Sequence, residues 1–164
     1  MAAGTRYTEE MASGSNMAAR ILRHDWWRTP LGPLERWPRA LRTALDICLN
    51  SRLPTALYCG RDLLLIYNDA WMPVPAEKHA WVLGRPAREV WADVWEIVGP
   101  QFAHVLETGQ GIAVYDQMLP VVRDGRACET YWSYGFTPIR DDTGEIIGIF
   151  NQGYETTEKV LAQR

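Results

Sequence analysis

Aromatic side chains recur at every second position near the end of the chain. Trp132, Tyr134 and Phe136 alternate with other residues, so a strand would carry all three on one face. Rings gathered in this way either fill a hydrophobic core or form the wall of a cavity that binds a small molecule. The full set of candidate ligand-binding residues is Trp132, Tyr134, Phe136, Met118, Asn151, Asp116 and His104.

Polar residues in this set carry the more specific hypothesis. If Asn151 and Asp116 point inward, each needs a hydrogen-bonding partner, and a ligand, a neighbouring strand or water would each serve. His24, His79 and His104 have no companion motif, and the three cysteines lack the spacing of metal ligands. Neither haem nor a metal ion is therefore expected.

Signatures of common enzymes are absent from the sequence. It has no glycine-rich phosphate loop, nucleophile elbow or zinc-binding spacing, and the pair Asp141-Asp142 is expected in a solvated turn. One enzymatic alternative is a small open α+β barrel that uses Asp116 and His104 as an acid–base pair across a cavity. Its long helix would precede the sheet, whereas the non-enzymatic interpretation places two strands before the short helices.

Composition limits the protein to one domain with a single core. The chain has 164 residues, 17 basic and 20 acidic, which gives a net charge of −3 without a basic cluster. Nucleic acid and anionic membranes are not expected as partners. The cysteine usage and the lack of an apolar leader or spanning segment predict a reduced, cytoplasmic setting.

Alternating patterns predict five strands. Residues 128–139 and 145–154 form a hairpin around the turn residues Asp141 to Gly144, because glycine adopts positive φ easily. The other strands are expected at residues 54–59, 63–67 and 112–122. Between the second and third strands, Asn68 or Asp69 can cap a short helix, and helical pieces are expected at residues 86–94 and 99–108, with residues 98–106 walling the cavity.

The N-terminal third is expected to be mainly helical. Residues 1–14 are expected to be disordered, and residues 15–52 to form a helical extension, which starts with a helix capped by Ser15 or Asn16. A second helix ends near residue 51 and carries one apolar stripe. The stripe packs either on the sheet of its own chain or on a second subunit, and it consists of Trp37, Leu41, Ala44, Leu45 and Cys48.

Several motifs in sequence order resemble a PAS domain. Thr137-Pro-Ile-Arg-Asp141, the turn at Gly144, Gly148-Ile-Phe-Asn151 and Glu155-Thr-Thr157 are similar to the last third of that family. Further motifs resemble the PAS subgroup at the front of cytoplasmic sensor histidine kinases, and the whole resemblance covers about residues 17–164. These further motifs are Asp25-Trp26, Thr29-Pro-Leu-Gly-Pro33, Trp37-Pro38, Lys78-His79, Leu83-Gly-Arg-Pro86 and Glu89-Val-Trp91.

The resemblance implies an α+β fold and a sensory function. The expected architecture is a five-stranded antiparallel sheet in the order 2-1-5-4-3, flanked by short helices, with a PAS domain at residues 53–156 and an outgoing helix beginning at residues 157–164. A signal in the cavity would pass through Glu155, Thr156 and Thr157 to that helix and on to a kinase module. Glu155 is also expected to meet Arg123, Arg126 or Arg140.

Partners and cofactors follow from the same resemblance. Kinases of this class act as dimers, so a homodimer through the N-terminal helices is expected, and a ligand-free dimerisation module is the alternative to a ligand sensor. Flavin is not expected, because the photoactive flavin-binding relatives need a cysteine that the segment Gly84-Arg-Pro-Ala87 lacks. The domain itself is not expected to be an enzyme.

Overall fold

Five antiparallel strands form one sheet in the order β2-β1-β5-β4-β3, which confirms the expected topology. The computed structural model describes residues 16–164, so the segment expected to be disordered, residues 1–14, and the candidate cap Ser15 lie outside the described residues. β5 pairs with both β1 and β4 and so occupies the centre. The strands are β1 (Thr55–Cys59), β2 (Leu64–Tyr67), β3 (Ile112–Arg123), β4 (Arg126–Arg140) and β5 (Ile146–Glu155).

The turn between β4 and β5 is closed by one aspartate. The carboxylate Oδ1 of Asp141 accepts hydrogen bonds from the Thr143 backbone N–H at 2.9 Å and from the Glu145 N–H at 3.1 Å. Gly144 adopts a φ of 85°, a conformation that glycine takes without steric cost. This turn therefore fixes the register that places Asn151 opposite Phe136.

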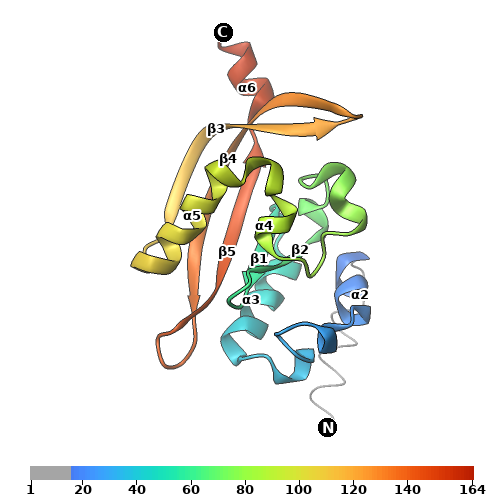
Figure 1. Cartoon of the computed structure of the whole chain (residues 1–164), viewed down its shortest axis with the longest axis vertical. Helices are drawn as coiled ribbons and strands as arrows, with labels where there is room; N and C mark the ends of the chain where they lie inside the picture. Colours follow the sequence, from blue (N-terminus) through green and yellow to red (C-terminus); the bar gives the residue numbers. More distant parts are fainter. Residues whose placement is uncertain (1–15) are drawn as a thin grey trace.

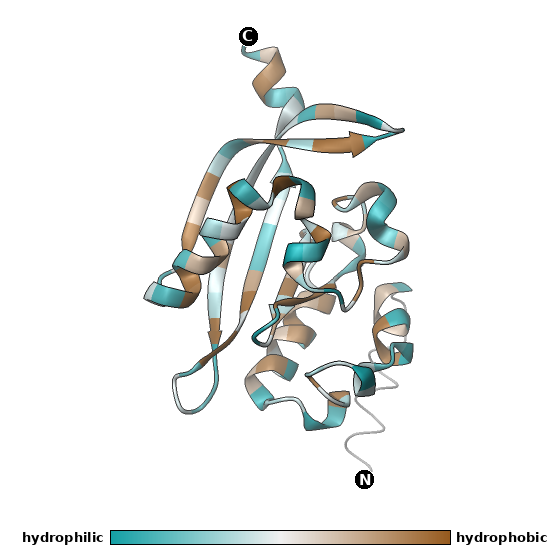
Figure 2. Cartoon of the chain, viewed as in Figure 1, coloured by the Kyte–Doolittle hydropathy of each residue, from teal (hydrophilic) through white to brown (hydrophobic). Residues whose placement is uncertain are grey.

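A β-bulge bends β3 in its middle. Val114 pairs with Tyr134, but the next pair is Gln117 with Trp132, so two residues of β3 oppose only Ser133 of β4. Asp116 has a φ of 50° at this point. Figure 1 shows the sharp bend of β3, and Figure 2 shows that polar residues interrupt its apolar run there. Because a bulge bends its strand, the end of the β3–β4 hairpin turns over the sheet.

Short helices cover the face of the sheet that carries Tyr58 and Phe136. α5 (Trp95–Thr108) lies in front of β3 and β4 in Figure 1 and ends at Gly109, which has a left-handed φ of 67°. It begins four residues before the expected start at residue 99. The other elements on this part of the chain are η3 (Asp69–Trp71), η4 (Ala76–Ala80), α4 (Ala87–Val90) and η5 (Ala92–Val94).

The opposite face of the sheet packs on α3 (Arg39–Asn50). The Nδ2 group of Asn68 donates to the carbonyl oxygens of Cys48 at 2.9 Å and Leu53 at 2.9 Å, while its Oδ1 accepts from the Trp71 N–H at 3.1 Å. One amide thus joins the end of α3 to the start of η3, which it caps as expected. Before α3 the chain forms α2 (Asn16–Arg23), η1 (Trp26–Arg28) and η2 (Leu34–Arg36).

The apolar stripe, which the structure places on α3 and on Trp37 just before it, is core of its own chain. Its five residues are all buried, and Leu45 and Cys48 have no exposed surface. The hypothesis that this stripe is a homodimer interface is therefore wrong, because a second subunit has no apolar surface of the stripe left to cover. The stripe consists of Trp37, Leu41, Ala44, Leu45 and Cys48.

None of the helices within residues 16–164 is both long and apolar enough to cross a membrane. The last helix, α6 (Thr157–Ala162), leaves the molecule at the end of β5, beside the bent part of β3 (Figure 1). It begins four residues after Gly153, a residue of the central strand that lines the covered side of the sheet.

Candidate functional site: an aromatic cavity between the sheet and the helices

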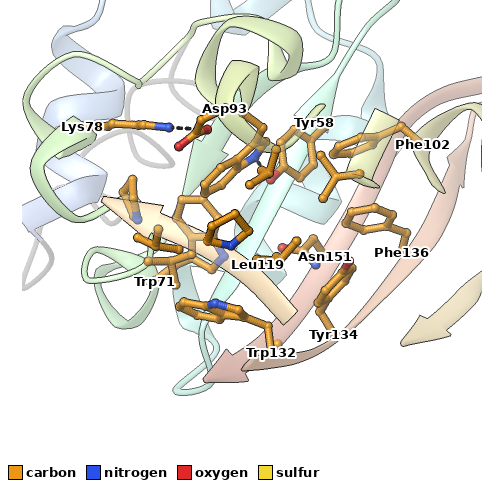
Figure 3. A pocket seen from close by; sticks show the side chains of 18 of the residues that line it. Tyr58, Trp71, Lys78, Asp93, Phe102, Leu119, Trp132, Tyr134, Phe136 and Asn151 are labelled. Atoms are coloured by element: carbon orange, nitrogen blue, oxygen red, sulfur yellow. Dashed lines mark hydrogen bonds and ion pairs between the residues drawn. The ribbon is translucent and has the colours of Figure 1, made fainter. Parts of the chain in front are cut away.

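A cavity of about 80 Å³ lies between the sheet and its helical cover. Its floor comes from β1, β4 and β5, its sides from the helices, and its far edge from the bent end of β3 (Figure 3). The lining is mostly aromatic and aliphatic. It includes Tyr58, Trp71, Trp91, Val98, Phe102, Leu119, Trp132, Tyr134, Phe136 and Asn151.

The alternation of β4 and β5 places four candidate residues at the cavity, as the sequence predicts. Trp132, Tyr134 and Phe136 line it from β4, and Asn151 lines it from β5. Gly153 follows on the same face, where a Cβ atom would come within 2.5 Å of the Cβ of Tyr134. Only glycine therefore fits this close approach of β4 to the end of β5.

Stacked rings make the deep end of the cavity. Phe102 of α5 stacks on Phe136 with a centroid distance of 4.4 Å and an interplanar angle of 20°. The Tyr58 ring meets Phe102 edge-on at 4.7 Å. Edge-to-face and offset pairs are the favoured aromatic geometries. The rings consequently hold α5 and the sheet at a fixed separation.

Most polar atoms of the lining already have partners in the protein. The Trp91 Nε1–H donates to the Tyr58 hydroxyl at 3.0 Å, and the Tyr134 hydroxyl donates to Gln101 Oε1 at 2.5 Å. Burial raises the pKa of Tyr134 to about 12, so this hydroxyl stays protonated at neutral pH. The remaining polar function is the amide of Asn151.

Asn151 offers a hydrogen-bond acceptor to the cavity. Its Nδ2–H group donates to the carbonyl oxygen of Gly135 at 3.0 Å, which fixes the orientation of the amide. Its Oδ1 makes no hydrogen bond within residues 16–164. This oxygen is accessible from the cavity rather than sealed in the core, so a ligand with a donor group can form a hydrogen bond with it in place of water.

The mouth of the cavity carries one ion pair. Lys78 Nζ lies 2.9 Å from Asp93 Oδ1, donates to the carbonyl oxygen of Val90 at 2.7 Å and lies 5.3 Å from the centroid of the Trp91 ring. The rim also carries two exposed residues, Val122 and Tyr154. Figure 3 shows the ion pair at the edge and the rings further inside.

Three candidate residues lie elsewhere, so their expected positions were wrong. The bulge reverses the alternation of β3, which turns Met118 outward and brings Leu119 to the cavity. Asp116, at the bulge itself, contacts Lys159 of α6 at 3.3 Å. His104 lies on the exposed side of α5. An acid–base pair of Asp116 and His104 across the cavity is thereby excluded.

The predicted wall at residues 98–106 contributes Val98 and Phe102, but the sequence analysis did not find the other lining residues from the helical segments and from β1. Tyr58, Trp71, Trp91 and Lys78 belong to segments without a strict period, and their convergence depends on how the helices pack. The high count of tryptophans, eight in the chain, was a signal for Trp71 and Trp91 only. Leu119 could have been found only by anticipating the bulge.

The joint between β5 and α6 holds the three relay candidates together. Arg123 of β3 binds Glu155 through two contacts, Nη2–Oε1 at 2.7 Å and Nη1–Oε2 at 3.3 Å. Among the three arginines considered from sequence, Arg123 is thus the partner. The Thr157 hydroxyl donates to Glu155 Oε2 at 2.6 Å and accepts from the Tyr131 N–H at 2.9 Å.

Neither Thr156 nor Thr157 caps α6 with its side chain. The hydroxyl of Thr156, the residue before the helix, makes no capping hydrogen bond, and the Thr157 hydroxyl is engaged by β4 and Glu155 instead. The arginine contact is the first cause, and the Thr157 hydrogen bond a further cause, of a lowered pKa of Glu155. Glu155 therefore stays ionised and keeps this joint closed.

Cofactor-sized groups do not fit the cavity as it stands. A volume of about 80 Å³ is well below the roughly 300–1,000 Å³ of pockets that bury drug-sized ligands. Within residues 16–164 no group of three or more histidine, cysteine, aspartate or glutamate side chains could hold a metal ion. The site is suited to a small, largely apolar molecule.

Solved structures share this arrangement. An RNA-binding light-oxygen-voltage receptor matches with a TM-score of 0.55 and 17% identity over 75% of this chain and 36% of that one. VqmA of Vibrio cholerae, described as a LuxR-type receptor, matches at 0.52 and 22% identity over 72% and 52% of the two chains. A PAS domain from Colwellia psychrerythraea matches at 0.52 and 11% identity over 72% and 98%.

These likenesses concern the fold, since all three identities are low. None of the curated proteins compared with the chain matches it. A family match is more extensive than any local motif, because residues 54–161 match the family described as PAS fold. That range includes all five strands, the aromatic cavity and most of α6. With its sheet order and helical cover, the chain belongs to the PAS family.

Proposed function

We propose that this PAS domain is a sensory module whose aromatic cavity binds a small apolar or monocyclic aromatic molecule with one hydrogen-bond donor. The observation that carries the proposal is the free Oδ1 of Asn151, which faces a cavity lined otherwise by rings and aliphatic side chains. A ring would pack on Phe136 and Trp132, and its donor would satisfy Asn151.

The size of the cavity limits the ligand. Its volume of about 80 Å³ is roughly half of the 150 Å³ apolar cavity that binds benzene in an engineered protein. A six-membered ring therefore requires outward movement of rim residues such as Tyr154 and Val122, which are 61% and 43% exposed. This movement couples occupancy to the end of β5.

Signal transmission then follows the chain. Tyr154 precedes Glu155, which holds Arg123 and Thr157 at the start of α6. A ligand that moves the rim would shift the equilibrium between two positions of this joint, and α6 would carry the change onward. We infer that the recipient is a histidine kinase module and that the domain itself performs no catalysis. The kinase assignment is supported by the sequence motifs.

Binding can be tested with phenol as the probe. Leu119→Trp should fill the cavity, whereas Met118→Trp on the opposite face of β3 is the matched control. Phenol should raise the melting temperature of the wild type and of Met118→Trp, and calorimetry should show binding to both but not to Leu119→Trp. Equal binding by all three proteins would exclude the cavity as the binding site.

A second function is favoured by the small volume. If the rings of the cavity are simply core, the domain is a ligand-free interaction module, which is consistent with the stacked contact of Phe102 and Phe136. In that case phenol should leave the melting temperature of the wild type unchanged. Light scattering of the protein would then show whether it self-associates.

A further inference from the structure

A second hollow lies between α2 and the end of η4. It has a volume of about 250 Å³ and shares no lining residue with the aromatic cavity. Its walls come from the last turn of α2 with the residue that follows it, and from the last residue of η4 with the segment that follows. The lining consists of Arg20, Arg23, His24, Ala80, Trp81 and Leu83.

Two guanidinium groups give the hollow a positive charge. Arg20 and Arg23 are three residues apart on α2, so they lie on the same side of the helix. No acidic residue lines the hollow. Within residues 16–164, Arg23 makes no hydrogen bond or ion pair, and the nearby Asp25 is paired instead with Arg28 at 3.0 Å. The positive charge of the hollow is therefore not neutralised by its walls.

Arg20 is held in place by a histidine. Its Nη1 group lies 3.0 Å from Nε2 of His79, and because arginine can only donate, Nε2 must be the acceptor. The proton of the imidazole is then on Nδ1, which donates to the Tyr67 hydroxyl at 2.8 Å. This chain from β2 through η4 to α2 orients the guanidinium without neutralising it, so further donor groups of Arg20 stay available.

One wall of the hollow is flat and apolar. Trp81 is 48% exposed and makes no ring contact with another described residue, while Leu83 beside it is buried. Water solvates a large exposed aromatic surface poorly, and this indole lies next to two guanidinium groups that have no carboxylate partner among the lining residues. Its face is suited to stacking with a planar ring.

We propose that this hollow binds a small aromatic carboxylate. The carboxylate would accept hydrogen bonds from Arg23 and Arg20, for which the planar guanidinium fork is well matched, and the ring would stack on Trp81. The volume of about 250 Å³ suits a single ring better than a nucleoside phosphate, which combines the same two chemical features in a larger molecule. The site is separate from the aromatic cavity and does not depend on its function.

Four probes separate charge, ring and size. Isothermal titration calorimetry at constant ionic strength would use benzoate, benzamide, acetate and adenosine monophosphate with the full chain. Benzoate should bind at least roughly tenfold more tightly than benzamide, because charge-assisted hydrogen bonds exceed neutral ones by about that factor. It should also bind more tightly than acetate, which lacks the ring, and than adenosine monophosphate.

Paired variants assign the binding to the hollow. Arg23→Gln should weaken benzoate binding by roughly tenfold, whereas Arg39→Gln, which removes an exposed arginine at the start of α3, should leave it unchanged. Trp81→Ala should also weaken it, whereas Trp27→Ala, at a tryptophan that is 68% exposed on η1, should not. The melting temperatures of all four variants verify that each is folded.

Three results would overturn the proposal. The first is an equal affinity for benzoate and benzamide. The second is an equal loss of benzoate affinity in Arg23→Gln and Arg39→Gln. The third is the absence of any heat of binding with benzoate. If adenosine monophosphate binds more tightly than benzoate, the ligand of the hollow is a nucleoside phosphate and not an aromatic carboxylate. Leu119→Trp, which fills the aromatic cavity, should keep its affinity for benzoate, so this site and the sensory cavity succeed or fail separately.

Discussion

Arg123, at the end of β3, binds Glu155, at the end of β5, through two nitrogen–oxygen contacts of 2.7 Å and 3.3 Å. The two strands are not neighbours, because β4 lies between them in the sheet. The pair therefore crosses β4 and ties the bent end of the hairpin to the start of α6. Both side chains are about one third exposed, so the contribution to stability is at most about 1 kcal/mol.

Glu155→Gln should loosen α6 without unfolding the domain. The free energy of unfolding should fall by no more than about 1 kcal/mol, while the amides of α6 should exchange hydrogen faster. Glu145→Gln, at an exposed position before β5, is the control. Hydrogen exchange followed by mass spectrometry measures the effect. A lower stability with unchanged exchange in α6 would limit Glu155 to a structural role.

Leu41→Asp should unfold the protein. Leu41 is 1% exposed inside the chain, and an unpaired carboxylate there costs more than about 4 kcal/mol, a large part of the stability of a typical domain. Ile47→Asp, on the exposed side of the same helix, should stay folded. Circular dichroism and thermal melting distinguish the two. A folded, monomeric Leu41→Asp would restore the stripe as an interface between subunits.

Phe136→Ala should destabilise the domain by about 3–5 kcal/mol. The Phe136 side chain is 3% exposed and stacks on Phe102, so its removal leaves a void between the sheet and α5. Tyr154→Ala, at an aromatic residue on the rim of the same cavity, should cost only about 0.5 kcal/mol, because that ring is mostly exposed. Urea denaturation measures both. If both variants lose the same free energy of unfolding, the rings near α5 contribute no more to stability than the ring on the rim.

Acid should weaken the contact between α2 and η4. Burial, and then the charge of Arg20, lower the pKa of His79 below its usual 6.5, so the folded state takes up a proton less readily than the unfolded state. Stability is therefore complete above about pH 6.5 and falls as the pH drops below that value. His24 shifts in the same direction, with burial as the main cause.

The histidine contribution can be isolated by substitution. Between pH 7.5 and 5.5 the melting temperature of the wild type should fall more than that of His79→Gln, whose amide oxygen can still accept from Arg20. His104→Gln, at an exposed histidine on α5, should behave as the wild type does. An identical pH dependence of wild type and His79→Gln would show that Arg20 does not depend on a neutral imidazole.

The sheet was predicted from the alternation of residue types along its strands and from the residues of its turns. The hairpin of β4 and β5 was predicted from the ring spacing and the Asp141 to Gly144 turn, and the strand order came with the resemblance to the family. The positions of Trp132 and Asn151 at the cavity followed from the same period of two. Their role in ligand binding stays a prediction.

The bulge of β3 marks the limit of such reasoning. One additional residue in β3 moves every later side chain of the strand to the other face of the sheet, so Leu119 lines the cavity instead of Met118. The single local signal was the aspartate at position 116, since aspartate adopts positive φ more readily than most residues. The stripe of α3 was equally ambiguous, because a buried face and an interface have the same period.

The bulge of β3 also affects how the molecule behaves towards its own copies. β3 is an edge strand of twelve residues, and an unpaired edge of that length is a template for strand addition and aggregation. The bend at Asp116 and the missing N–H of Pro120 divide this edge into short pieces. The irregularity that shapes the cavity thus also protects the sheet from growing into a fibril.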